Sequence, residues 1–154
     1  MRTIISFTFV LIVVFYITGC KKNDDVDISP EQIAKKVITE LQIENMSEVT
    51  EKNLSAHYNI SIDKLSDFSV YITNDDEKIY DVAVFLAKKA DDIPSIKAAI
   101  SERTSHKATV LDTSKSTNLE ILHNNVLETK GLYVFFAITE NSQKARSIFE
   151  EFFN

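Results

Sequence analysis

Three histidines and one cysteine are the side chains of this sequence best suited to metal or nucleophilic chemistry. His57, His106 and His123 are far apart in the chain and lack a metal-binding spacing such as H-E-x-x-H. No serine stands in a G-x-S-x-G motif, and a lone cysteine, Cys20, cannot form a disulfide within the chain. We therefore expect a protein that is not an enzyme and that uses no cofactor and no metal.

Acidic residues cluster in three short segments, 24–27, 75–77 and 91–92. None of them has the alternating ligand positions of an EF-hand loop. We interpret these segments as solvated turns and a helix cap, and a weak calcium site is the alternative.

Charge and composition exclude further classes of function. The 154 residues contain 17 Lys and Arg against 23 Asp and Glu, which gives a net charge of -6. An acidic chain is poorly suited to nucleic acid, because that binding depends on basic side chains that neutralise phosphates. With only 2 glycines the chain cannot form a phosphate-binding G-x-G-x-x-G loop. The 44% of hydrophobic residues is enough to build the core of one domain of this length.

The first twenty residues have the pattern of an export signal. An uncharged apolar run from Thr3 to Cys20 follows the positive charge of Arg2. A positive start, an apolar centre and small residues at the end are typical of a secretory signal peptide. Residues 17–20, Ile-Thr-Gly-Cys, resemble a bacterial lipobox, which implies cleavage after Gly19 and a lipid on Cys20. A spanning helix that is not cleaved and an ordinary cleaved signal are the alternatives, and all three place the rest of the chain outside the cytoplasm.

These patterns divide the chain into three parts. Residues 1–19 are expected to be a lipoprotein signal peptide, residues 20–29 the lipidated Cys20 and a tether, and residues 30–154 a single α+β domain. Residues 21–29 of the tether reach at most about 30 Å when extended. We therefore expect the domain to stay beside the cell membrane, on its extracytoplasmic face.

The expected domain alternates helical and strand patterns. Ser29-Pro30-Glu31-Gln32 is typical of a helix start, and apolar residues continue at helical spacing to Leu41. A short helix is expected within 45–57, and period-two or wholly apolar patterns predict strands at 67–73, 79–87 and 132–138. A further strand is expected within 118–129, and helices are expected after Asp91-Asp92-Ile93-Pro94 and around Ala145 to Phe152.

A similarity between two segments of the chain suggests how these elements are arranged. The segments 84–87 (VFLA) and 134–137 (VFFA) are similar, and each has a strand partner before it and a helix after it. The sequence therefore predicts an N-terminal helix followed by a repeated strand-strand-helix unit. This implies an α+β fold with a four-stranded, mostly antiparallel sheet and with helices packed on one face.

In such a sheet, aromatic residues would lie on the face that the helices do not cover. Tyr71, Phe85, Tyr133 and Phe135 are expected there, where an exposed apolar patch would form a candidate binding site for an envelope protein or peptide. The alternative is that the first helix, or a second copy of the chain in a homodimer, covers this face. The outer strands, at 68–73 and 119–126, are also candidate edges for the addition of a peptide strand.

Three segments taken in order resemble a known family. They are 58–72, 81–85 and 130–149, and they follow a lipobox. This order is similar to that of small uncharacterised lipoproteins of Gram-positive bacteria, the domain-of-unknown-function family numbered four-three-five-eight, over roughly residues 30–153. The chain departs from the family at Asp81, where Glu is frequent, and at Leu86, where Lys is common. The family has no established activity, so the resemblance implies no functional residue.

Two functions follow as expectations. The first is a non-enzymatic module that binds a protein or peptide of the cell envelope. The alternative is a lipoprotein that binds or senses a small ligand in a pocket between the sheet and the helices. The second function requires a concave cavity lined by a few convergent polar groups.

Overall fold

A computed structural model describes residues 28–74, 78–111 and 116–154. The predicted signal peptide, Cys20, most of the tether and the predicted acidic segment 75–77 lie outside these residues. Among the helices that are described, none is long and apolar enough to cross a membrane.

The chain has an α+β fold, as predicted. Its helices and strands, in order, are α1 (Pro30–Glu40), β1 (Met46–Glu48), α2 (Glu51–Tyr58), β2 (Leu65–Thr73), β3 (Asp81–Ala87), α3 (Ile93–Val110), α4 (Ser116–His123), β4 (Val126–Lys130), β5 (Tyr133–Ile138) and α5 (Ser142–Glu151). Two short 3-10 helices, η1 (Ile62–Lys64) and η2 (Ala90–Asp92), precede β2 and α3.

The described strands form one antiparallel sheet in the order β1-β2-β3-β5-β4. This sheet has five strands, not the four that were predicted, because Met46–Glu48 pairs with the end of β2 where the sequence suggested a helix. The predicted strand within 118–129 is also shorter than expected, since residues up to His123 form α4. The two strands that are apolar on both faces, β3 and β5, are the central pair, as such strands usually are.

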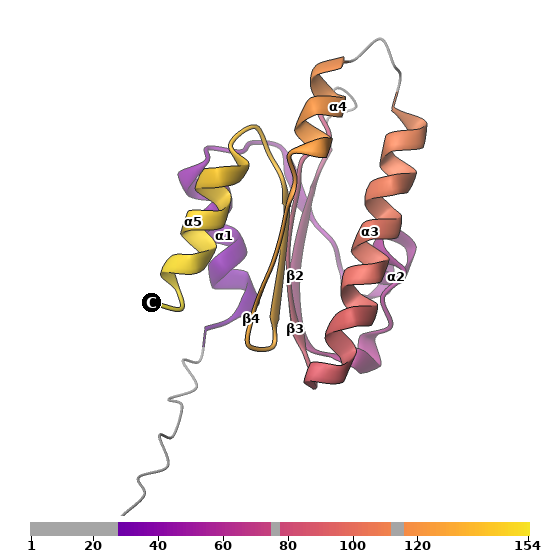
Figure 1. Ribbon diagram of the computed structural model, residues 1–154, viewed down its shortest axis with the longest axis vertical. Helices are drawn as coiled ribbons and strands as arrows, with labels where there is room; N and C mark the ends of the chain where they lie inside the picture. Colours follow the sequence, from indigo (N-terminus) through magenta and orange to yellow (C-terminus); the bar gives the residue numbers. More distant parts are fainter. Residues whose placement is uncertain (1–27, 75–77, 112–115) are drawn as a thin grey trace, which may run out of the picture.

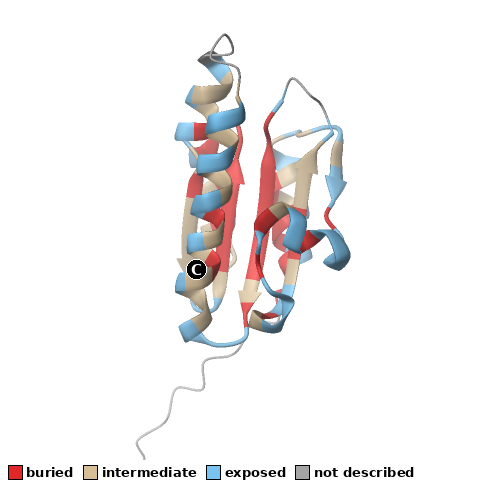
Figure 2. Cartoon of the chain, turned by 90° about the vertical axis from the view of Figure 1, so that its right-hand side faces the viewer, coloured by how far each residue is buried: buried red, intermediate tan, exposed pale blue. Residues whose placement is uncertain are grey.

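Helices cover both faces of the sheet (Figure 1). α1 and α5 pack on one face, and α2, α3 and α4 pack on the other. The prediction that all helices pack on one face is therefore wrong. Its physical reason is that β3 and β5 are buried along almost their whole length, and Figure 2 shows the strands behind α2 and α3 coloured mostly as buried. A single layer would leave one apolar side of β3 and β5 in water.

The register of the central strands explains why the two helices of the repeat lie on opposite sides. Val84 pairs with Phe135 and Phe85 pairs with Val134, so Phe85 and Phe135 point to opposite faces. Each of these phenylalanines faces the helix that follows its own strand, α3 or α5. The strand-strand-helix order recurs, with α4 in between. A two-fold axis perpendicular to the sheet would relate the two antiparallel strand pairs and place α3 and α5 on one face. Since they lie on opposite faces, the two strand-strand-helix units are not related by such an axis.

The local signals at helix starts are confirmed. The Ser29 hydroxyl accepts from the Gln32 amide at 3.2 Å, and the Gln32 side chain accepts from the Ser29 amide at 3.1 Å. Pro30 and Pro94 both lie in the first turn of a helix. Gly131 has a φ of 56° in the two-residue turn between β4 and β5, a conformation that glycine adopts without strain.

Candidate functional site

The four aromatic residues predicted to share an open face are not exposed together. Phe85 and Phe135 are both fully buried and lie on opposite sides of the sheet. Tyr71 and Tyr133 are half-buried against the layer formed by α1 and α5. The predicted exposed face is therefore wrong, and the alternative that the first helix helps to cover it is the one the structure shows.

A buried carboxylate is the most unusual group of the opposite face. Asp81 is the first residue of β3 and is 0% exposed. Strand alternation turns its side chain toward α3, where Arg103 and Lys107 are four residues apart and so share one side of the helix. Arg103 Nε donates to Asp81 Oδ2 at 2.8 Å, and Lys107 Nζ donates to Oδ1 at 2.9 Å. One helix therefore supplies two cations to one carboxylate.

Tyr58, at the end of α2, completes what we call the Asp81 cluster (Asp81, Arg103, Lys107 and Tyr58). Its hydroxyl donates to Asp81 Oδ2 at 3.1 Å, and its ring lies 4.5 Å from the Arg103 guanidinium carbon. Arg103 Nη1 also donates to the carbonyl oxygen of His57 at 2.8 Å, so the cluster joins α2, α3 and β3.

Burial and charge act together on the protonation of this cluster. Burial lowers the pKa of Lys107, although the carboxylate of Asp81 opposes this shift. Burial also disfavours the charged form of Arg103, but attraction to Asp81 and Tyr58 outweighs it and raises the Arg103 pKa. Burial, reinforced by Asp81, holds the pKa of Tyr58 well above its ordinary value, so this hydroxyl stays protonated and donates. With both cations charged, the cluster has one positive charge in excess.

A cavity of about 390 Å³ opens beside the cluster, at the end of the sheet where β3 begins. Among the described residues, Lys78, Arg103 and Lys107 contribute three basic side chains to its lining, and Asp81 contributes the one acidic side chain. Apolar side chains form much of the remaining wall, namely Ile72, Ile79, Val110 and Leu111. This Asp81 cavity therefore combines an apolar surface with an excess of positive charge.

Arg103 and Lys107 keep donors that the cluster does not use. A guanidinium has five N–H groups and an ammonium has three. The hydrogen bonds within the described part of the chain engage Nε and Nη1 of Arg103, while Lys107 Nζ donates to Asp81 and to the carbonyl oxygen of Ile79. The remaining donors suit an oxyanion such as a carboxylate or a phosphate, for which charged donors form strong hydrogen bonds.

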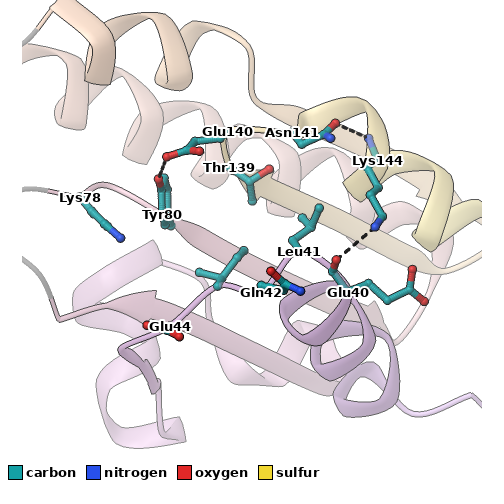
Figure 3. A pocket seen from close by; sticks show the side chains of 11 residues that line it. Glu40, Leu41, Gln42, Glu44, Lys78, Tyr80, Thr139, Glu140, Asn141 and Lys144 are labelled. Atoms are coloured by element: carbon teal, nitrogen blue, oxygen red, sulfur yellow. Dashed lines mark hydrogen bonds between the residues drawn. The ribbon is translucent and has the colours of Figure 1, made fainter.

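A second cavity, of about 460 Å³, lies at the same end of the sheet on the side of α1 and α5 (Figure 3). Its polar groups are mostly paired with one another, since the Tyr80 hydroxyl donates to Glu140 and Lys144 Nζ donates to the carbonyl oxygen of Glu40 at 3.1 Å. The buried hydroxyl of Thr139 has no hydrogen-bond partner among the described residues. Acidic side chains outnumber basic ones here, so this cavity is less suited to an anion.

Two of the three histidines line one cavity. His57 and His106 lie on helices, as predicted, and line a third cavity of about 300 Å³ beside Arg103. Burial, and then the charge of Arg103, lowers the pKa of His57. His123 lies within the segment 119–126 that was predicted to be an outer strand, but it ends α4, because residues 116–123 form a helix. Within the residues that are described, no group of three His, Cys, Asp or Glu side chains could hold a metal ion.

The sequence analysis did not find the Asp81 cluster. Asp81 is 22 residues from Arg103 and 26 residues from Lys107, so no local motif joins them. Two signals were present. One is a carboxylate that opens an otherwise apolar strand, and the other is a pair of basic residues at helical spacing on a helix that packs on that strand.

The fold is thus an antiparallel α+β sheet with a helical layer on each face and a charged cluster beneath one of them. A family model described as Domain of unknown function (DUF4358) matches residues 39–139. The match spans more than half of the chain, and the chain belongs to this family. It includes all five described strands and α2 to α4, and it leaves out most of α1 and all of α5. No curated protein and no solved structure matches the chain.

Proposed function

We propose that this chain is a lipid-anchored extracytoplasmic binding protein, without enzymatic activity, that takes a small anionic ligand in the Asp81 cavity. The anchor is inferred from residues 17–20, which end at Cys20. The ligand class is inferred from the convergence of Lys78, Arg103 and Lys107 on one cavity. Between the two functions left open by the sequence, ligand binding is favoured because the aromatic face that would have met a protein is filled by helices.

Packing alone gives little reason for the Asp81 cluster. Removing charges from water costs free energy that their mutual attraction only partly offsets, so a buried ion cluster is rarely a net source of stability. The cluster does fix two cations, because Asp81 holds both of them at hydrogen-bond distance. Side chains fixed in this way bind a ligand with a smaller loss of conformational entropy. The apolar wall of the cavity favours an anion that also has an apolar part.

Calorimetric titration of the full lipidated chain in detergent tests the ligand class. The probes are inorganic phosphate, citrate and butyrate, which differ in charge and in apolar content. Lys78→Gln and Lys107→Gln should each weaken binding of the best probe by about tenfold or more, because each removes a charged donor. Lys89→Gln is the matched control, since Lys89 is an exposed lysine beyond the far end of β3. Absence of binding by every probe, or an equal loss in the control, would contradict the proposal.

Mass spectrometry of the N-terminal peptide tests the anchor separately. A diacylglyceryl group on the sulfur of Cys20, with residues 1–19 removed, is the expected result. An unmodified Cys20 would refute lipidation, and a peptide that still contains residues 1–19 would favour the spanning helix.

Capture of a protein or peptide remains a second candidate because β4 lies at an edge of the sheet. β4 ends the strand order and pairs only with β5 among the described strands. Of the two edges predicted from the sequence, β2 is covered at Tyr71–Thr73 by β1, and residues 119–123 are helical. A peptide or a second copy of the chain could add to β4.

Photo-crosslinking on intact cells tests this candidate. A photoreactive residue at Lys130, in β4, should join the partner, and the same residue at Lys52, an exposed position in α2, should not. Equal crosslinking from both positions would contradict strand addition.

A further inference from the structure

The end of the sheet opposite the Asp81 cavity carries most of the exposed apolar side chains. Among the described residues, three large apolar side chains are exposed: Ile62, Val110 and Leu132. Leu132, 37% exposed, lies in the turn between β4 and β5, and Ile62, 41% exposed, lies in η1 just before β2. Val110 lies at the other end, where α3 ends beside the Asp81 cavity.

Hydrogen bonds bring the segments of this end together. The amide of Ala87 donates to the carbonyl oxygen of Leu132 at 2.9 Å, and the amide of Lys88 donates to that of Lys64 at 2.9 Å. The Tyr133 hydroxyl donates to the carbonyl oxygen of Ile28, the first described residue, at 2.7 Å. The start of α1 and the β4–β5 turn therefore lie at the same end of the molecule (Figure 1). We call it the tether end, because the predicted tether joins the domain there.

The tether end carries charged side chains of both signs. Among the described residues, its lysines are Lys64, Lys88, Lys89 and Lys130, and its acidic residues are Glu31, Asp63, Asp67, Asp91 and Asp92. The tether end therefore has no excess of lysine, and acidic residues outnumber basic ones by 23 to 17 in the whole chain. Lys88, Lys89 and Lys130 are exposed, so their ammonium groups can reach phosphate.

We propose that the tether end rests on the phospholipid headgroups of the membrane that holds the anchor. Leu132 and Ile62 lie at the interface in this arrangement, and the lysines lie beside lipid phosphates. The proposal depends on the lipid anchor of the proposed function. The eight peptide steps from Cys20 to Ile28 reach at most about 30 Å, so the lipid keeps this end at the bilayer.

Lipid suits this surface better than a protein partner does. A stable protein interface buries about 800 Å² on each partner and has an apolar centre. Two exposed apolar side chains among lysines do not provide such a centre. A short tether instead gives the headgroups a high local concentration, so weak contacts are enough to orient the domain.

This orientation has a consequence for the Asp81 cavity. The cavity lies where β3 begins, and the tether end lies where β3 ends. The strand spans about 20 Å between them. The cavity therefore faces away from the membrane, toward ligands that arrive from outside.

Fluorescence quenching by labelled lipid tests the orientation. The full chain, lipidated on Cys20, is placed in vesicles of phosphatidylglycerol and phosphatidylcholine that contain a lipid with a nitroxide headgroup. Leu132→Cys and Val110→Cys each accept the same fluorophore, because Cys20 is the only other cysteine and its sulfur carries the lipid. The label at position 132 should be quenched several-fold more than the label at position 110, since Val110 is an exposed apolar residue at the far end.

A charge reversal tests the role of the lysines. Lys130→Glu in the Leu132→Cys chain should reduce quenching, and Lys52→Glu, an exposed site on α2, should not. High salt should also reduce quenching, because the Debye length falls to about 3 Å at 1 M.

The outcomes separate this proposal from the anchor. Equal quenching at both positions, or stronger quenching at position 110, in a chain whose Cys20 is shown by mass to be lipidated overturns the orientation and leaves the anchor intact. A Cys20 without lipid overturns the anchor and the orientation together.

Discussion

The two faces of the sheet are built from the same strands but are filled with different chemistry. On the side of α1 and α5, Phe135 stacks on Phe149 with ring centroids 4.8 Å apart, and Phe149 meets Phe153 at 5.0 Å. On the side of α2, α3 and α4, the core includes Phe85 and also the fully buried carboxylate of Asp81. The first layer is held by burial of apolar surface, whereas the second keeps fixed charges beside a cavity.

The boundaries of the family match follow this difference. Residues 39–139 include every member of the Asp81 cluster, and they leave out nearly all of α1 and all of α5, the two helices of the apolar layer. The comparison therefore separates a layer that stabilises the sheet from the layer that contains the proposed binding cavity. The predictions below test that separation, beginning with the largest effect.

Truncation of the apolar layer should have the largest effect on stability. Phe149→Ala removes a fully buried ring and should lower the free energy of unfolding by about 3–5 kcal/mol. Affinity for the anion probe should be unchanged under conditions where the variant is folded, because the ring lies on the other face of the sheet. Urea titration followed by circular dichroism measures the stability. Val110→Ala, at an exposed site, should stay within about 0.5 kcal/mol of the natural chain.

Loss of the buried carboxylate should destabilise through charge. Asp81→Asn leaves Arg103 and Lys107 without their counterion while both stay mostly buried, at 14% and 19% exposure. The expected loss is about 3 kcal/mol in the same urea titration.

Replacement of the whole charged set separates stability from binding. The triple variant Asp81→Leu, Arg103→Met and Lys107→Met should recover most of the stability lost in Asp81→Asn, because no buried charge is left unpaired. It should also lose affinity for the anion probe. A triple variant that still binds the probe would show that the two layers do not differ in function.

The tyrosine of the cluster should contribute less. Tyr58→Phe removes the hydroxyl that donates to Asp81 but keeps the ring beneath Arg103, so the loss should be about 1.5 kcal/mol. The half-buried Tyr71→Phe is the comparison from the other layer, and it should cost less because its side chain is more exposed. Equal losses of unfolding free energy in the two variants would mean that the hydrogen bond to Asp81 does not add to stability.

The sequence predicted the elements that depend on local signals. The cap at Ser29 and the first-turn prolines each depend on neighbouring residues, and each is confirmed. The three-residue strand β1 was missed because it is too short for a periodic pattern and is defined by its pairing with β2.

The errors about the sheet faces come from pairing between distant segments. The similarity of 84–87 to 134–137 suggested that Phe85 and Phe135 share a face. In the sheet, however, Phe85 pairs with Val134 and not with Phe135, which is an offset of one residue. Such an offset reverses the face of every side chain. The Asp81 cluster was missed for a related reason, since the packing of α3 on β3 brings its members together.

Acidification should have the smallest effect, and it concerns the charged layer. Burial and the charge of Arg103 hold the pKa of His57 below its ordinary value of 6.5, so the folded chain binds fewer protons there than the unfolded chain just below that pH. Protonation then favours unfolding, and the free energy of unfolding should fall as the pH drops through 6.5 toward the depressed pKa. His57→Gln keeps the backbone carbonyl that accepts from Arg103 and should make this fall shallower in urea titrations at pH 7 and pH 5. A fall in His57→Gln as steep as in the natural chain would contradict the role of His57.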